Sequence, residues 1–131
     1  MTHALTLRVY YEDVDLAGIV YYANYLRFYE RGRSEALRAA GIDQSALRAA
    51  GLVFVVVRVE ADYLLPARYD DALRVETAAE EIRAATLVLA QRILREADGA
   101  LLNRARIRVA AMDLEGRPKR LPRAVRAAFT A

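Results

Sequence analysis

The spacing of hydrophobic residues along the chain changes after the first twenty positions. Residues 5–11 alternate between apolar and polar side chains, a period of two that is typical of a strand. A short acidic loop containing Asp15 and Gly18 interrupts the alternation. From about Tyr22, apolar residues recur every three or four positions, which predicts a long amphipathic helix that ends near Gly41.

The predicted helix has one face for burial. Its apolar and small residues fall on that side, and these are Tyr22, Tyr25, Leu26, Tyr29, Gly32, Ala36 and Ala40. A glycine inside a helix costs roughly 1 kcal/mol relative to alanine, so we predict that another backbone segment approaches closely at Gly32. Elsewhere on the helix, Glu30 is spaced to pair with Arg33, and Glu35 is spaced to pair with Arg31 or Arg38.

The rest of the chain is predicted to be mainly strand. A short helix is expected over residues 44–50, and four strands follow, separated by turn residues such as Asp98-Gly99. A second short helix is expected at the end of the chain. The predicted ranges are 53–63, 72–80, 86–95 and 101–112 for the strands and 122–129 for the last helix.

These elements favour an α+β fold with a single antiparallel sheet. Short connections join successive strands, and such connections place neighbouring strands antiparallel. The helix from Tyr22 is the only long amphipathic element available to cover one face of the sheet. The sequence thus predicts an antiparallel five-stranded sheet wrapped around one long central helix. Open edge strands favour pairing between copies, so we expect a homodimer as the minimal unit.

Composition narrows the class of protein. The chain has 131 residues, of which 56% are hydrophobic, and this is enough for the core of a single domain over residues 1–131. Cysteine is absent, which fits a reducing compartment. The sequence contains neither a signal-peptide pattern nor an apolar run long enough to cross a bilayer, so we expect a cytoplasmic protein without a membrane span.

Basic residues gather near the C-terminus. Arg104, Arg106 and Arg108 alternate with apolar residues, as in a half-buried strand with a solvated arginine face. A site for phosphate groups is the alternative, because arginine binds phosphate in a bidentate manner. The sequence has no recognised nucleic-acid motif and no basic segment interleaved with aromatic residues, so no nucleic-acid partner is expected.

The acidic loop and the helix start carry the candidate chemistry. The first N–H groups of a helix lack internal partners and can stabilise an oxyanion. A carboxylate at Asp15 and free amides at the start of the helix would flank one carbonyl, with Asp15 as general base or nucleophile and Gly18 leaving room for the substrate. The simpler interpretation is an acidic cap that complements the helix dipole.

The residues of this opening motif resemble those of a known family. They run Asp15-Leu-Ala-Gly18-Ile-Val-Tyr-Tyr22-Ala-Asn24-Tyr25, followed by Phe28, Glu30, Arg33 and Glu35. The pattern resembles the 4-hydroxybenzoyl-CoA thioesterase family of hotdog-fold enzymes, and most closely the YbgC-type, Tol-Pal-associated acyl-CoA thioesterases. The resemblance implies a hotdog fold and hydrolysis of an acyl-CoA thioester.

The same resemblance implies roles for single residues. Asp15 matches the family's catalytic aspartate, and Tyr22 matches the residue whose backbone N–H polarises the thioester carbonyl. Many YbgC-type members have histidine at the position of Tyr22. Arg83 matches the first residue of a basic segment associated with coenzyme A, although Ala84 and Ala85 replace the basic residues that follow.

The resemblance also implies partners. Family members place the active site between two subunits and commonly form tetramers, so a homotetramer is expected. Coenzyme A is part of the substrate, no cofactor is expected, and an acyl carrier protein is the alternative carrier. The principal alternative function is a non-catalytic hotdog module that binds acyl-CoA or an acyl carrier protein.

Two other kinds of site fit the sequence less well. A Ser-His-Asp triad needs a poised histidine, and the only histidine, His3, falls in a predicted N-terminal tail. Neither the acidic loop nor Asp70-Asp71 has the spacing of a calcium loop, so no metal site is expected. We interpret Asp70-Asp71 as a turn.

Overall fold

The structure, a computed structural model, describes residues 2–130. The two terminal residues, which the predicted 1–131 domain includes, lie outside this range. The described strands are β1 (Thr2–Arg8), β2 (Val53–Tyr63), β3 (Ala72–Ile82), β4 (Thr86–Arg95) and β5 (Leu101–Met112). The described helices are the 3-10 turn η1 (Tyr11–Asp13) and the α-helices α1 (Asn24–Ala39), α2 (Gln44–Ala49) and α3 (Arg123–Thr130).

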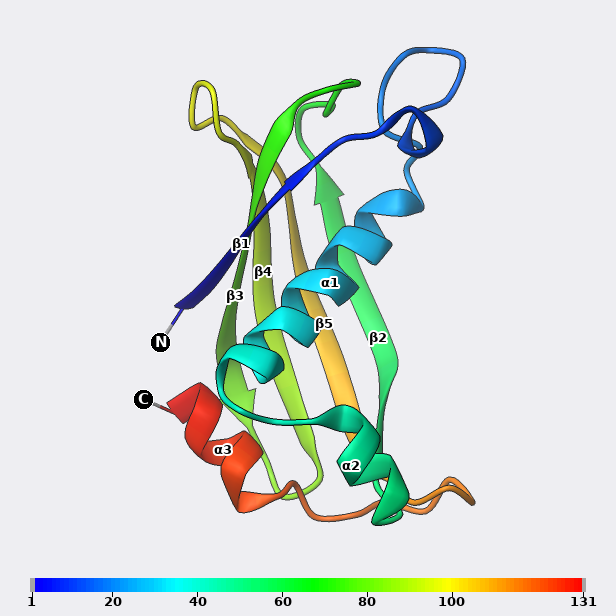
Figure 1. Cartoon of the computed structure of the whole chain (residues 1–131), viewed down its shortest axis with the longest axis vertical. Helices are drawn as coiled ribbons and strands as arrows, with labels where there is room; N and C mark the ends of the chain where they lie inside the picture. Colours follow the sequence, from blue (N-terminus) through cyan, green and yellow to red (C-terminus); the bar gives the residue numbers. More distant parts are fainter. Residues whose placement is uncertain (1, 131) are drawn as a thin grey trace.

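The five strands form one sheet in the order β1-β3-β4-β5-β2. Each pair of neighbours is antiparallel, which confirms the predicted antiparallel five-stranded sheet. The sheet curves, and α1 lies across one of its faces (Figure 1). β1 and β2 are the two edges, and Val56, Val57 and Val59 of β2 are 39–54% exposed.

The 16 residues of α1 bury one face against the sheet, but not the whole predicted stripe. Phe28 and Leu37 belong to the buried face, whereas Leu26 is 40% exposed. Tyr22 and Ala40 were wrongly placed in this face, because α1 begins at Asn24 and ends at Ala39. The sheet covers the side of the helix that carries Phe28, which the spacing of apolar residues alone did not identify.

Gly32 marks the closest approach of α1 to the sheet. A Cβ atom built on Gly32 would lie 2.7 Å from Cγ1 of Val75 and 3.1 Å from Oγ1 of Thr77. The predicted close approach is therefore present, but side chains of β3 fill the space in place of the expected backbone. A side chain larger than hydrogen cannot enter without displacing them.

Gln91 of β4 ties α1 to the sheet by hydrogen bonds. Its buried Nε2 donates to the main-chain oxygen of Tyr29 at 3.0 Å and to Oγ1 of Thr77 at 2.8 Å. Its Oε1 accepts from Nη1 of Arg33 at 3.1 Å. Beside this group, the Tyr29 hydroxyl donates to Oδ1 of Asn103 at 2.6 Å. These bonds fix the helix on the sheet because buried polar groups are costly without partners.

The remaining predicted elements agree with the structure to within a few residues, except at the N-terminus. β1 extends from Thr2 to Arg8, so His3 lies in a strand paired with Thr77 and not in a tail. Gly41 has φ of +79° directly after α1, which is the left-handed conformation expected there. Among residues 2–130, no helix has the length and hydropathy needed to cross a membrane.

Candidate active site

Asp15 lies in a tight hairpin between η1 and α1. An antiparallel bridge joins Val14 to Val20, and the N–H of Asp15 donates to the oxygen of Ile19 at 3.1 Å. The Asp15 carboxylate is exposed, and its Oδ1 accepts from the N–H of Ala17 at 2.9 Å. Gly18 adopts φ of +77°, and a Cβ atom there would meet nothing within 4 Å. The turn conformation by itself favours glycine, and substrate clearance at Gly18 stays a prediction.

The hairpin is fixed to the segment between β2 and β3. Ile19 bridges Arg68 in antiparallel fashion, and the N–H of Val20 donates to the oxygen of Ala67 at 2.8 Å. The N–H of Ala67 in turn donates to the hydroxyl oxygen of Tyr25 at 3.0 Å. The loop that carries Asp15 is thus held by main-chain hydrogen bonds within the hairpin and to residues 67–68.

Asp13, the buried acidic residue two positions before Asp15, stabilises the loop by hydrogen bonds. Its buried carboxylate accepts from the N–H of Tyr10 at 2.8 Å. Its main-chain oxygen accepts from the N–H of Tyr21 at 2.9 Å and from Nδ2 of Asn24 at 2.9 Å. Asp13 therefore joins η1 to the start of α1 and leaves Asp15 as the exposed carboxylate of the hairpin.

Tyr22 lies in the turn that leads into α1, two residues before Asn24. It was predicted within the first turn of the helix, and the structure moves it just outside. Among residues 2–130, its N–H has no hydrogen-bond acceptor, while its oxygen accepts from the Tyr63 hydroxyl at 2.8 Å. Tyr22 is 63% exposed, and the centroid of its ring lies 4.9 Å from that of Tyr21.

Asp15 and Tyr22 line one surface pocket of about 350 Å³. Tyr25, Tyr63 and Leu65 form part of its apolar wall. The rings of Tyr25 and Tyr63 meet edge to face at 5.3 Å. Burial raises the pKa of both hydroxyls above the ordinary tyrosine value, so both are neutral at pH 7. The pocket combines one carboxylate, an amide without an internal acceptor and an apolar wall.

The sequence did not indicate Tyr63 as a site residue. It is the last residue of β2 and is 41 residues away from its hydrogen-bond partner. A tyrosine at the end of a strand carries no local signal for such a contact. Tyr25 lines this pocket, whereas Tyr29, one turn further along α1, is fully buried in the core.

Arg83 is not brought to Asp15 within one chain. β3 begins at Ala72, which pairs with Arg8 near the hairpin, and runs to Ile82 at the other end of the sheet (Figure 1). Arg83 follows directly and pairs with Glu81 at 2.6 Å. Its main-chain oxygen accepts from Nη1 of Arg126 at 2.7 Å.

The other candidate residues make ion pairs and hydrogen bonds that stabilise the fold. Arg104 and Arg106 face solvent from β5 and pair with Asp62 at 3.0 Å and Glu80 at 2.9 Å, as in the predicted solvated arginine face. Arg108 is instead half-buried and pairs with Glu81 at 3.8 Å. On α1, Arg38 pairs with Glu35 as predicted. The predicted pair between Glu30 and Arg33 is wrong, because Glu30 accepts from Ser34 and Arg33 donates to Gln91.

The acidic residues do not assemble a metal site in the part of the chain that the structure describes. No group of three or more histidine, cysteine, aspartate or glutamate side chains could hold an ion there. Asp70 has φ of +71°, and the N–H of Arg68 donates to Asp71 at 2.9 Å. Asp70-Asp71 is therefore a turn, as predicted.

Comparison with known proteins shows the family of this chain. The profile of the thioesterase-like superfamily matches residues 9–129. The chain is 44% identical over 124 residues to the acyl-CoA thioester hydrolase YbgC of Escherichia coli O6:H1, and the aligned region covers 94% of this chain and 92% of that protein. It is 42% identical over 125 residues to the acyl-CoA thioesterase YbgC of Haemophilus influenzae, with coverages of 94% and 90%.

A solved structure agrees as well. The crystal structure of a probable thioesterase from Bartonella henselae is 38% identical, with a TM-score of 0.87 over 93% of this chain and 100% of that one. The expected hotdog fold is confirmed by these similarities. The chain therefore belongs to the thioesterase-like superfamily, within the group of YbgC-type thioester hydrolases that its opening motif indicated.

Proposed function

We propose that this protein hydrolyses an acyl-CoA thioester to a free acid and coenzyme A in the pocket beside Asp15. One observation carries the proposal: the exposed carboxylate of Asp15 and the turn at Tyr22 line the same pocket. The sequence similarity to YbgC proteins supports the substrate class. Neither feature requires a cofactor.

Asp15 is the group that initiates the reaction. As a nucleophile, its carboxylate attacks the thioester carbon, forms a mixed anhydride and expels the thiolate, and water then hydrolyses the anhydride. As a general base, it accepts a proton from the water that attacks the same carbon. In both routes, the carbonyl oxygen gains negative charge. The Tyr22 N–H, which has no acceptor among the described residues, donates to that oxygen.

The apparatus is small because a thioester needs little help in departing. A thiol has a pKa of about 8.5, so the thiolate leaves with little assistance from a general acid. The pocket has no histidine among its lining residues, and His3 lies in β1. Tyrosine in place of histidine at position 22 leaves the backbone amide available.

Arg83 requires a second copy if it contacts the same substrate. Asp15 and Arg83 lie at opposite ends of the sheet in one chain. We propose that the phosphates of coenzyme A bind Arg83 of another copy, with a dimer as the minimal unit and a tetramer as the full assembly. The exposed valines of the edge strand β2 support association. An acyl carrier protein is the alternative carrier, and we place the reaction in the cytoplasm.

The test is thiol release from short, long and aromatic acyl-CoAs by the native protein and by Asp15→Asn. We expect release to fall about a hundredfold or more in the variant, as is usual for loss of a catalytic base. Glu12→Gln is the matched control, because Glu12 is an exposed carboxylate of the same segment. Equal thiol release by the native protein and by Asp15→Asn contradicts the role of Asp15. Stoichiometric binding without any release favours a non-catalytic binding module.

A further inference from the structure

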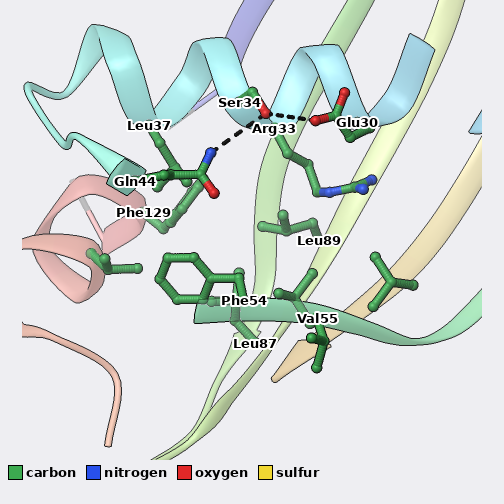
Figure 2. A pocket seen from close by; sticks show the side chains of 13 residues that line it. Glu30, Arg33, Ser34, Leu37, Gln44, Phe54, Val55, Leu87, Leu89 and Phe129 are labelled. Carbon is green, nitrogen blue, oxygen red and sulfur yellow. Dashed lines mark hydrogen bonds between the residues drawn. The ribbon is translucent and has the colours of Figure 1, made fainter. Parts of the chain in front are cut away.

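A second pocket, of about 200 Å³, lies beneath the C-terminal half of α1 (Figure 2). An engineered cavity of about 150 Å³ holds benzene, so this volume suits a ligand of about six to eight non-hydrogen atoms. Apolar side chains from α1, β2, β4 and α3 line most of it, including Leu37, Phe54, Leu87, Leu89, Val125 and Phe129. Such a lining favours a hydrocarbon chain or ring over a polar ligand.

One cation stands at this pocket without a carboxylate partner. Arg33 is half-buried, and within the described range 2–130 its guanidinium makes one hydrogen bond, from Nη1 to Oε1 of Gln91. It makes no ion pair within 4.0 Å among residues 2–130, whereas Arg38 on the same helix pairs with Glu35. Burial lowers the pKa of Arg33, yet a guanidinium remains charged at pH 7. Its other N–H groups are available to an acceptor.

The neighbouring acid, Glu30, partly offsets the effect of burial on the pKa of Arg33, but it makes no ion pair with Arg33 within 4.0 Å. Glu30 also lines the pocket, but its Oε1 accepts from Oγ of Ser34 at 3.1 Å (Figure 2). Gln44 reaches the same hydroxyl at 3.5 Å and closes that part of the rim. A partly desolvated charge is stabilised by an opposite charge with good hydrogen-bond geometry, and a carboxylate fits a guanidinium in bidentate fashion.

We propose that this pocket binds a small apolar carboxylate, with its anionic end on Arg33 and its hydrocarbon part among Leu37, Phe54 and Leu87. The ligand class follows from one unpaired cation beside an apolar cavity. It is also the class of the acid that the proposed thioesterase reaction releases, and this link alone rests on the proposed function.

Titration calorimetry with three probes tests the ligand class. Hexanoate has both the chain and the charge, hexanol has only the chain, and acetate has only the charge. We expect hexanoate to bind the native protein about tenfold or more tightly than either other probe, because charge-assisted hydrogen bonds add to apolar burial. Equal binding of hexanoate and hexanol overturns the role of Arg33, and equal binding of hexanoate and acetate overturns the role of the cavity.

Two variants test whether hexanoate binds in this pocket. Arg33→Gln removes the charge and should weaken hexanoate about tenfold or more while leaving hexanol unchanged. Ser34→Leu fills the cavity from the helix and should abolish binding of both. Arg27→Gln is the control, because Arg27 is an exposed arginine of the same helix. Thermal denaturation establishes that each variant folds. If Arg33→Gln fails to fold, Ser34→Leu and the three probes still test whether the pocket binds hexanoate.

The outcome is separable from that of the proposed function. Binding is measured without turnover, and Asp15→Asn should bind hexanoate as the native protein does. Retained hexanoate binding in Ser34→Leu overturns the proposal, since the probe then occupies another site such as the pocket at Asp15. Loss of thiol release in Asp15→Asn bears on the reaction alone.

Discussion

The hydroxyl of Tyr63 donates a hydrogen bond of 2.8 Å to the main-chain oxygen of Tyr22. This contact joins the last residue of β2 to the turn before α1, across 41 residues of sequence. It fixes the peptide that follows the proposed carbonyl-polarising amide. The geometry beside Asp15 therefore depends on where an edge strand of the sheet ends.

Removing this hydroxyl should slow the reaction without changing substrate affinity. We expect Tyr63→Phe to lower kcat about fivefold, since a lost hydrogen bond of about 1 kcal/mol loosens the Tyr22 turn, and to leave KM nearly unchanged. Steady-state kinetics of thiol release measure both constants. Tyr11→Phe is the control, because Tyr11 is 83% exposed and lies outside the pocket. A normal kcat in Tyr63→Phe contradicts a positioning role.

Arg83→Gln should separate the nucleotide part of the substrate from the acyl part. We expect KM for an acyl-CoA to rise about fivefold with kcat preserved, as a surface phosphate contact is lost. An acyl-pantetheine, which lacks the nucleotide phosphates, should be hydrolysed equally by both proteins. Arg48→Gln, at an exposed position of α2, is the control. The same KM increase for both substrates rules out a phosphate contact.

Gly32→Ala should destabilise the fold although alanine favours helices. The new Cβ would lie 2.7 Å from Cγ1 of Val75, so the Val75 side chain, the strand or the helix must shift. Overpacking of this kind costs about 1–3 kcal/mol. Alanine gains about 1 kcal/mol in helix propensity over glycine, so the cost of overpacking equals or exceeds this gain. Urea unfolding measures the difference, with Arg27→Ala on the exposed face of α1 as control. A stability gain near 1 kcal/mol in Gly32→Ala contradicts close packing at this position.

Glu76 gives stability a dependence on acid pH. Burial raises its pKa, but hydrogen bonds from Arg92 and Arg74 outweigh burial and the net shift is downward. The stabilisation is therefore complete above the unfolded pKa of about 4.3 and is lost as the pH falls through the lower folded pKa. We expect Glu76→Gln to cost about 1 kcal/mol at pH 7 and nothing below the folded pKa.

Urea unfolding at a series of pH values measures this contribution of Glu76. Glu115→Gln is the matched control, because Glu115 is exposed and makes no ion pair among residues 2–130. A cost in Glu76→Gln that is the same at every pH contradicts the assignment, since it would then arise from packing and not from the charge.

Local features could be predicted because they depend on neighbouring residues. The strands Val53–Tyr63, Thr86–Arg95 and Leu101–Met112 were predicted with their observed bounds. Their β-branched runs and turn residues specify extended chain and reversals directly. Asp15 could be proposed as a site residue from the sequence because its motif is contiguous and its loop is short.

The errors have a shared physical cause. The buried face of α1 includes Phe28 and excludes Leu26, and this depends on which side of the helix the curved sheet covers. His3 was assigned to a tail because its strand partner, Thr77, lies far along the chain. The spacing of hydrophobic residues indicates which residues lie on the same face of an element, but it does not indicate which other element packs against that face.

The sequence by itself determined the antiparallel sheet, the amphipathic helix and the acidic loop with Asp15, since each follows from spacing within about twenty residues. Tertiary structure decided that Tyr63 holds Tyr22, that Arg83 stands at the far end from Asp15, and that Arg33 faces an apolar pocket without a carboxylate partner in the described chain. Strand register and helix docking set these relations, because they bring together residues that no local pattern connects.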